Sequence, residues 1–316
     1  MINFRYHVVS LTAVFLALAI GLVVGTAALN GPLSDELNDR VNALSRQNQQ
    51  YRDQVNHLEE EANKQEQFAK ESAPVVLAGK LTNRRVLVVS MSGASKYVDG
   101  VVDYLTMAGA KVTGRVEVQD KFTDPANNEE LLYVANFSRP TGISLPTNSN
   151  GVETSTALLS AVLLDRPKPI TDDQHSDNPQ SVVLKAYTSR QYIIVTGNIT
   201  GTAEAVVVVA GPPYVDREAG KKNAAVLTMV TGLDQKVPIV VAGAGAGGDG
   251  NVLAQLRGDP TLTKSVSTVD NLSTEQGRVV TSLALAEQFE GRTGHYGIDA
   301  GATALLPKPA NADHNG

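Results

Sequence analysis

A glycine-rich segment in the C-terminal half has residue types and spacing suited to phosphate binding. Gly243, Gly245 and Gly248 form the pattern G-x-G-x-x-G directly after the apolar run VPIVV. Glycines at this spacing let a phosphate group approach the backbone at the start of a helix. Asp270 lies 22 residues beyond Gly248, where dinucleotide-binding folds place the carboxylate that binds ribose. The pattern therefore raises the hypothesis of a nucleotide or phosphate site.

Other reactive side chains are scattered along the chain. The loop at residues 172–177 combines three aspartates with His175, and a solvated acidic loop is its simpler interpretation. His295 stands in a glycine-rich segment, where a lone histidine is more often a structural hydrogen-bonding group than a catalyst. The absence of cysteine excludes disulfides, thiolate nucleophiles and thiolate metal sites, and no G-x-S-x-G motif is present. We therefore expect no enzyme activity, no metal site and no cofactor.

The elements that would position these residues alternate between strands and helices. Residues 85–90 form an apolar strand, a helical spacing follows at 96–108, and 111–116 returns as a strand. Runs such as AVVVVA are apolar on both faces, as in a parallel sheet covered by helices. We predict further strands at 192–196, 205–210 and 237–242 and one that leads to Asp270, and further helices at 152–164, 180–188, 218–232, 251–256 and 274–289. The sequence thus predicts a doubly wound, mostly parallel α/β domain over residues 80–306 and a flexible tail at 307–316.

A long uncharged segment lies near the N-terminus. Residues 8–29 include 22 residues without a charged side chain, and a helix of that length crosses a bilayer core of about 30 Å. Arg5 precedes the segment, whereas Asp35, Glu36 and Asp39 follow it. Because basic residues stay on the cytoplasmic side, we predict a single-pass plasma-membrane protein with a cytoplasmic N-terminus and an extracytoplasmic bulk. Nicotinamide cofactors are scarce outside the cytoplasm, so a geometric role of the glycine-rich turn is favoured over cofactor binding.

A cleaved signal peptide is the alternative interpretation of this segment. Residues 25–27 (Gly-Thr-Ala) offer a small-x-small cleavage site, but the length of the apolar run favours a retained anchor over residues 1–30. Ala17, Gly21 and Gly25 are spaced by four, and such a stripe lets two membrane helices approach closely. Small residues are also common in membrane helices, so the stripe alone does not establish self-association.

A heptad pattern follows the anchor between residues 31 and 73. Apolar side chains alternate at spacings of four and three among mostly polar neighbours, and so narrow a seam is typical of a coiled coil. Because an asparagine at an a position fixes the register of parallel dimers, we predict a parallel dimeric stalk roughly 50 Å long, which Pro74 ends. The alternatives are a helix packed on its own domain and a helix that recruits a partner. The d positions of this seam are Leu37, Leu44, Tyr51 and Leu58, and its a positions are Val41, Asn48, Val55 and Ala62.

Composition restricts the classes of function further. The net charge is −6 and no basic stripe is present, which argues against nucleic-acid binding. No second long apolar run occurs, so a multi-pass transporter is excluded. A pore would need polar side chains facing its lumen, and the apolar segment offers only Ser10, Thr12 and Thr26.

Both ends of the chain resemble one known family. The segment YHVVSLTAVFLALAIG at residues 6–21 is similar to that family's N-terminal anchor. STVDN at 267–271, LALAEQ at 283–288 and GHYG at 294–297 are similar to its C-terminal signature. By these motifs the chain is identified as a member of the actinobacterial copper transporter MctB family. The resemblance also covers the order of elements between the two ends, and residues 138–179 match least well.

The resemblance implies two incompatible functions. One class of members is described as channel-forming envelope proteins that keep intracellular copper low. A corynebacterial class, SteB, is described as a cell-separation factor that pairs with the membrane protein SteA and controls a peptidoglycan hydrolase through coiled-coil contacts. No catalytic or metal-binding residues come with the resemblance. We favour a homodimeric SteB-like scaffold that acts with a SteA-like membrane protein and the coiled coil of a hydrolase, and a copper efflux channel is the alternative.

Overall fold

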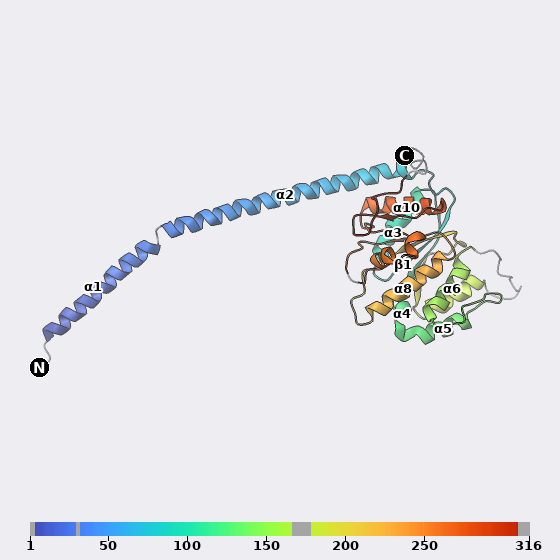
Figure 1. Ribbon diagram of the computed structural model, residues 1–316, viewed down its shortest axis with the longest axis horizontal. Coiled ribbons are helices and arrows are strands. Elements are labelled where there is room, and N and C mark those ends of the chain that lie inside the picture. The colour runs from blue at the N-terminus through green and yellow to red at the C-terminus, as the bar shows by residue number, and fades with distance from the viewer. Residues whose placement is uncertain (1–3, 30–31, 166–177, 249, 309–316) are drawn as a thin grey trace. The chain divides into compact units, whose positions relative to one another are not determined.

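The computed structural model describes residues 4–29, 32–165, 178–248 and 250–308 of the 316-residue chain (Figure 1). The acidic loop at 172–177 and most of the predicted tail lie outside these ranges. The chain divides into two compact units, residues 1–65 and 66–316. One long helix contributes to both units.

Two helices make up the first unit. Helix α1, Phe4–Leu29, contains a 24-residue span, Phe4–Ala27, that is long and apolar enough to cross a membrane, with a mean hydropathy of 2.6. The hydroxyls of Thr12 and Thr26 donate to the carbonyls of Val8 and Leu22 one turn earlier, so these polar groups are bonded within the helix. Helix α2, Pro32–Leu77, begins with a proline, which suits a first turn because that position needs no N–H donor.

Helix α2 continues through Pro74, so the prediction that this proline ends the helix was wrong. A proline inside a helix removes one backbone hydrogen bond and crowds the preceding turn. Here the helix ends only three residues later, and Ala73 and Leu77 of this last turn are fully buried in the second unit. Burial of the last turn therefore offsets the bond that Pro74 removes.

The second unit is built on a seven-stranded, mostly parallel sheet in the order β3-β2-β1-β4-β5-β6-β7. Only β3 runs antiparallel to its neighbour, β2. The predicted α/β class is confirmed, and every predicted strand agrees with an observed strand to within two residues at either end. The strands are β1 Arg85–Met91, β2 Lys111–Val118, β3 Ile193–Thr196, β4 Ala205–Val209, β5 Ile239–Ala242, β6 Ser267–Val269 and β7 His295–Tyr296.

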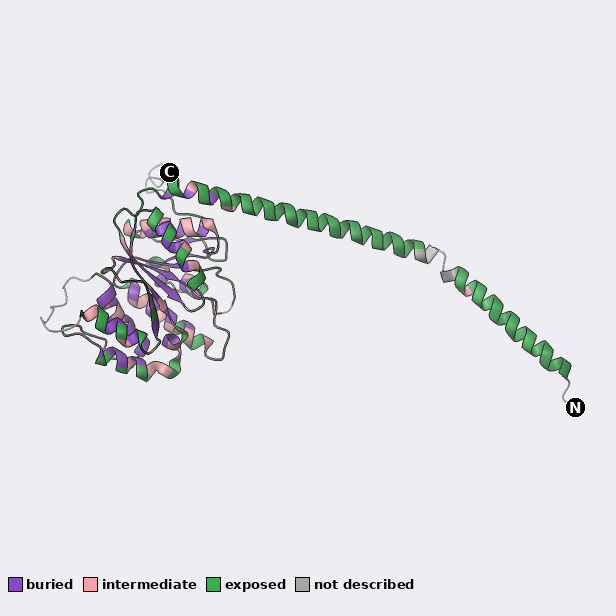
Figure 2. Cartoon of the chain, turned by 180° about the vertical axis from the view of Figure 1, so that it is seen from behind, coloured by how far each residue is buried: buried purple, intermediate pink, exposed green. Residues whose placement is uncertain are grey.

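Helices cover both faces of this sheet. Leu87 and Val89 of β1 pack with α4 to α9, whereas Val86 and Val88 pack with α3, α10 and the end of α2. Figure 2 shows the resulting buried layers in purple on either side of the strands. The predicted helices are confirmed to within two residues. The helices are α3 Ser95–Met107, α4 Asp120–Thr123, α5 Asn128–Phe137, α6 Gly151–Leu163, α7 Pro179–Thr188, α8 Ala219–Asp234, α9 Val252–Gly258 and α10 Glu275–Phe289, with 3₁₀ turns at Pro125–Asn127 and Leu262–Lys264.

Helices α4 and α5 and strand β7 were not predicted from the sequence. Helix α5 buries Leu131, Val134 and Ala135, a spacing of three and one that is a short helical signal. Strand β7 contains only two residues and follows a glycine-rich segment, so no alternating pattern marks it.

Candidate functional site

The glycine-rich turn lies at the carboxyl end of β5. The N–H of Gly243 donates to the carbonyl of Val269 in the neighbouring strand β6, at 2.8 Å. Gly245 and Gly248 have φ values of +127° and +92°, which side-chain-bearing residues rarely adopt. Open α/β sheets bind ligands at the carboxyl ends of their strands, so the turn occupies the expected place for a ligand site.

Side chains of the chain itself bond the polar groups of this turn. The N–H of Ala246 donates to the carboxylate of Asp299 at 2.6 Å. The amide of Asn251 donates to the carbonyls of Gly245 and Gly247 at 3.0 and 3.3 Å, and its oxygen caps α9. The carboxylate of Asp299 thus stands where an anionic ligand would accept a hydrogen bond. This arrangement favours a structural role of the turn.

Asp270, the residue matched to ribose binding, is 1% exposed. Its carboxylate accepts from Arg257 Nη1 at 2.9 Å and from the N–H groups of Ile298 and Asp299 at 2.8 and 3.1 Å. A Cβ at Gly297 would overlap this carboxylate, so a glycine is needed there. Asp270 therefore bonds within the chain, and the geometry favours this role over a contact with ribose.

Arg257 also begins a chain of hydrogen bonds that ends at His295. Its Nε donates to Thr268 Oγ1 at 2.9 Å, and that hydroxyl lies 2.9 Å from His295 Nδ1. His295 Nε2 lies 3.2 Å from the carbonyl of Thr263, which can only accept, so Nε2 donates and Nδ1 accepts. Burial, assisted by the charge of Arg257, holds the pKa of His295 below its ordinary value although the bond to Thr263 opposes this. His295 therefore acts as a neutral structural group.

Glu287 connects α10 to the same region. The Tyr296 hydroxyl donates to its carboxylate, and Arg292 bonds the other carboxylate oxygen. Burial, together with the Glu287 carboxylate, raises the pKa of Tyr296. Gln288 donates to Ser267 Oγ at 2.8 Å. The three segments of the C-terminal signature, 267–271, 283–288 and 294–297, therefore hold one another together around β6 and β7.

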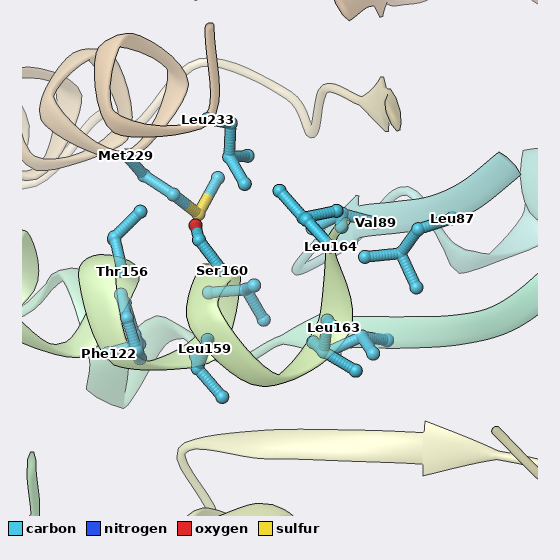
Figure 3. Close-up of a pocket in the computed structure, with 12 residues that line it drawn as sticks. Leu87, Val89, Phe122, Thr156, Leu159, Ser160, Leu163, Leu164, Met229 and Leu233 are labelled. Atoms are coloured by element: carbon cyan, nitrogen blue, oxygen red, sulfur yellow. The ribbon is translucent and has the colours of Figure 1, made fainter. Parts of the chain in front are cut away.

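A small cavity lies between the sheet and helices α6 and α8 (Figure 3). Its volume is about 30 Å³, which accommodates a water molecule and is far too small for a nucleotide or a sugar. The hydroxyls of Thr156 and Ser160 are buried there and have no hydrogen-bond partner within the described part of the chain. The residues around the cavity are Leu87, Val89, Val116, Val118, Phe122, Thr156, Leu159, Ser160, Leu163, Leu164, Met229 and Leu233.

The seam on α2 is exposed along its whole length. Its large apolar side chains are between 51% and 64% exposed, and Asn48 is exposed among them. Polar residues outside the seam bond along the helix, as Arg40 does to Glu36 at 2.9 Å and Lys64 to Glu60 at 2.8 Å. Such pairs stabilise one helix by only about 0.2–0.5 kcal/mol each. The six large exposed apolar residues are Leu37, Val41, Leu44, Tyr51, Val55 and Leu58.

The small-residue stripe on α1 is likewise open. A Cβ added to Gly21 or Gly25 would meet nothing within 4 Å, so the chain itself gives no steric reason for these glycines. Ala17 on the same stripe is exposed. Within the described residues no three His, Asp or Glu side chains come together in a group that holds a metal ion.

Comparison with known proteins assigns the chain to a family. A family model described as "Copper transport outer membrane protein, MctB" matches residues 1–307. A protein of Mycobacterium leprae (strain TN) named "Copper transporter MctB" is 31% identical over 322 residues, which cover 96% of this chain and 99% of the relative. Its namesake in Mycobacterium tuberculosis (strain ATCC 25618 / H37Rv) is 29% identical over 321 residues with the same coverage. The match includes the apolar helix, α2 and the α/β unit, and the chain therefore belongs to the MctB family.

Proposed function

We propose that this protein is a membrane-anchored dimeric scaffold that regulates cell-envelope assembly or cell separation through contacts between proteins. The observation that carries the proposal is the exposed seam of α2, where six large apolar side chains are at least half exposed. A continuous apolar stripe of this kind is stable in water only when another surface covers it. The α/β unit serves as a folded platform, and neither catalysis nor a cofactor is part of this function.

The partner that covers the seam is a second copy in parallel orientation. Asn48 stands at an a position, where paired asparagines satisfy each other and fix the register of two parallel helices. Anchors in one membrane also hold two copies parallel. The stripe of Ala17, Gly21 and Gly25 offers a second contact between the same two chains inside the bilayer.

The proposed location is the plasma membrane, with the N-terminus in the cytoplasm and the α/β unit outside. The apolar span of α1 is the only helix in the described residues with the length and composition to cross a bilayer. Arg5 before it and the acidic residues after it favour this orientation. The family description names the outer membrane instead, and this proposal differs from it in that respect.

The further partners in this proposal are a SteA-like membrane protein and the coiled coil of a peptidoglycan hydrolase. A stalk of two paired helices presents grooves into which an amphipathic helix of another protein fits. The dimer would thereby hold the hydrolase near the membrane and govern its activity.

Copper transport is the second candidate, and the names of the relatives favour it. Against it, Thr12 and Thr26 use their hydroxyls within α1, which leaves little polar surface for a pore. The carboxylate and imidazole groups of the described residues also do not gather into a metal site. Cysteine, the strongest copper(I) ligand, is absent from the whole chain.

A deletion strain complemented with seam variants distinguishes the two candidates. The strain carries the parent gene, Leu44→Asp/Leu58→Asp, or the control Asn42→Asp/Asn56→Asp, which adds the same charges at the same spacing away from the seam. In copper-depleted medium we expect the seam variant alone to accumulate septated, unseparated cells. Normal separation in every strain, with growth loss of the deletion only as copper is added, would instead support metal export and contradict the scaffold.

A further inference from the structure

We infer that the heptad face of α2 changes its partner at Gln65. A second copy of this chain covers the face over residues 37–62, and the chain's own α/β unit covers it over residues 66–73. Because it needs a second copy, this arrangement rests on the dimer proposed above. The inference goes beyond that dimer in two respects. The paired region has a defined end, and the chain's own α/β unit competes with the second copy for the heptad face of α2.

The repeat of seven residues continues past the exposed seam. The a positions that follow Val55 are Ala62 and Ala69, and the d positions that follow Leu58 are Gln65 and Ser72. Seven residues are close to two helical turns, so these positions lie on one side of the helix. The exposed part and the later part of α2 thus present the same face.

Burial on this face changes abruptly. The large apolar side chains up to Leu58 are more than half exposed, whereas Ala69 at an a position is 7% exposed, Ser72 at a d position is half-buried and Ala73 at the flanking e position is 0% exposed. Ala73 and Leu77 belong to the core that α3 and α10 form on one face of the sheet. Between residues 66 and 73, the a, d and e positions that would pair with another copy are therefore already buried or half-buried, whereas Val76, at the a position beyond Pro74, is 41% exposed.

Glu66 marks the change of partner. Its carboxylate accepts the N–H of Glu275 at 2.6 Å, at the first residue of α10, where an anion also interacts favourably with the helix dipole. Glu275 in turn bonds Arg278 at 2.9 Å and accepts from the Tyr104 hydroxyl. The Glu66 carboxylate is thus already bonded to α10. In a coiled coil extended past Gln65, the same carboxylate would lie at the edge of the interface between the two helices.

Charge also opposes a longer paired region. In the heptad register Glu61 is a g position and Glu66 is the e position of the next heptad. Parallel helices place g of one copy beside e of the other, so extension would bring these two carboxylates together. Two copies therefore separate after Gln65, and the paired region spans about 40 Å rather than the roughly 50 Å predicted from sequence.

Cysteine scanning in the full-length protein tests this arrangement, since the chain contains no cysteine of its own. Single variants Leu44→Cys, Leu58→Cys and Ser72→Cys place thiols at three d positions, and Asn56→Cys is the control away from the seam. Membranes are oxidised with diamide, and the disulfide-linked dimer is quantified by gel electrophoresis. We expect strong linkage at 44 and 58 and at least tenfold weaker linkage at 72 and 56.

The outcomes separate this inference from the dimer on which it rests. Equal linkage at Leu58→Cys and Ser72→Cys, with none at Asn56→Cys, would overturn the change of partner and leave the dimer in place. Absence of linkage at both Leu44→Cys and Leu58→Cys would overturn the dimer itself. Ser72→Cys is a change of one atom at a half-buried position, so misfolding does not explain a low yield there.

Discussion

Two regions depart from the usual arrangement of apolar residues inside and charged residues outside. They are the α2 seam and the buried hydrogen-bond network of Arg257, Asp270 and Glu287 around β6 and β7. On α2, large apolar side chains are exposed, whereas around β6 and β7 the Arg257–Asp270 pair and Glu287 are buried. Each buried charge has partners within the chain, while the described residues supply none for the six apolar side chains of the seam. The difference indicates that the network completes the fold, and it supports the proposal that the seam contacts another polypeptide.

The largest expected effect comes from breaking the buried pair. Arg257→Ala would leave the carboxylate of Asp270 without its cation at a side-chain exposure of 0%. Removal of one partner from such a pair costs about 3–5 kcal/mol of unfolding free energy. Urea unfolding of the protein in detergent micelles measures this cost. The control Arg40→Ala breaks an exposed pair, and its cost is expected to stay below about 0.5 kcal/mol.

This network shows where sequence reasoning succeeds and where it stops. The strands and helices were predicted because apolar runs and helical spacing follow directly from local sequence. The spacing of Gly243, Gly245 and Gly248 correctly placed a turn at a strand end, for which a geometric role was already favoured over cofactor binding. The counter-ion of Asp270 is Arg257, which stands in an unremarkable helix, and no local pattern relates the two.

The next largest effect is expected from acidification, which tests the buried His295. The folded pKa of His295 lies below its unfolded value near 6.5, so the unfolded chain takes up a proton that the folded chain does not. The contribution of His295 to the unfolding free energy is therefore fully present above pH 6.5. It falls as the pH drops below that value, by at most about 1.4 kcal/mol per pH unit. Unfolding measured from pH 7.5 to 5.5 tests this slope. His295→Asn should flatten it, and an unchanged slope in that variant would assign it to other groups.

A smaller effect is expected at Glu66, where α2 contacts α10. Glu66→Ala removes the acceptor for the N–H of Glu275 and the anion at the start of α10. We expect a loss of about 1 kcal/mol in unfolding free energy, as for other helix caps. Glu60→Ala is the matched control, because its exposed pair with Lys64 contributes no more than about 0.5 kcal/mol. Equal effects of the two variants would argue against a special role for Glu66.

The smallest effect is expected at the cavity. Thr156→Val keeps the shape of the side chain and removes a hydroxyl that has no partner in the described structure. The unfolding free energy should change by less than about 1 kcal/mol and should not fall. Thr154→Val, two residues earlier, removes a hydroxyl that donates to the carbonyl of Asn150 at 2.8 Å and should lower stability. A clear loss in Thr156→Val would indicate that its hydroxyl is bonded after all.

The seam itself shows a different limit of sequence reasoning. The heptad spacing predicted the helix and its exposed face, whereas the separate prediction that Pro74 ends the helix was wrong. Burial of Ala69 and Ala73 in the second unit depends on long-range contacts, and an alanine at an a position such as Ala69 fits a coiled coil equally well. Local spacing therefore identified the face of the helix but not which surface covers it.

The mass of the full-length protein in detergent solution tests the central claim most directly. Sedimentation equilibrium, with the bound detergent matched by solvent density, is carried out on the parent, on Leu44→Asp/Leu58→Asp and on Asn42→Asp/Asn56→Asp. We predict that the parent and the control are dimers. For the seam variant, we predict that the dissociation constant of the dimer rises at least a hundredfold, so that the monomer predominates. A monomeric parent, or a dimer that the seam variant leaves intact, would contradict the assignment of the seam to self-association.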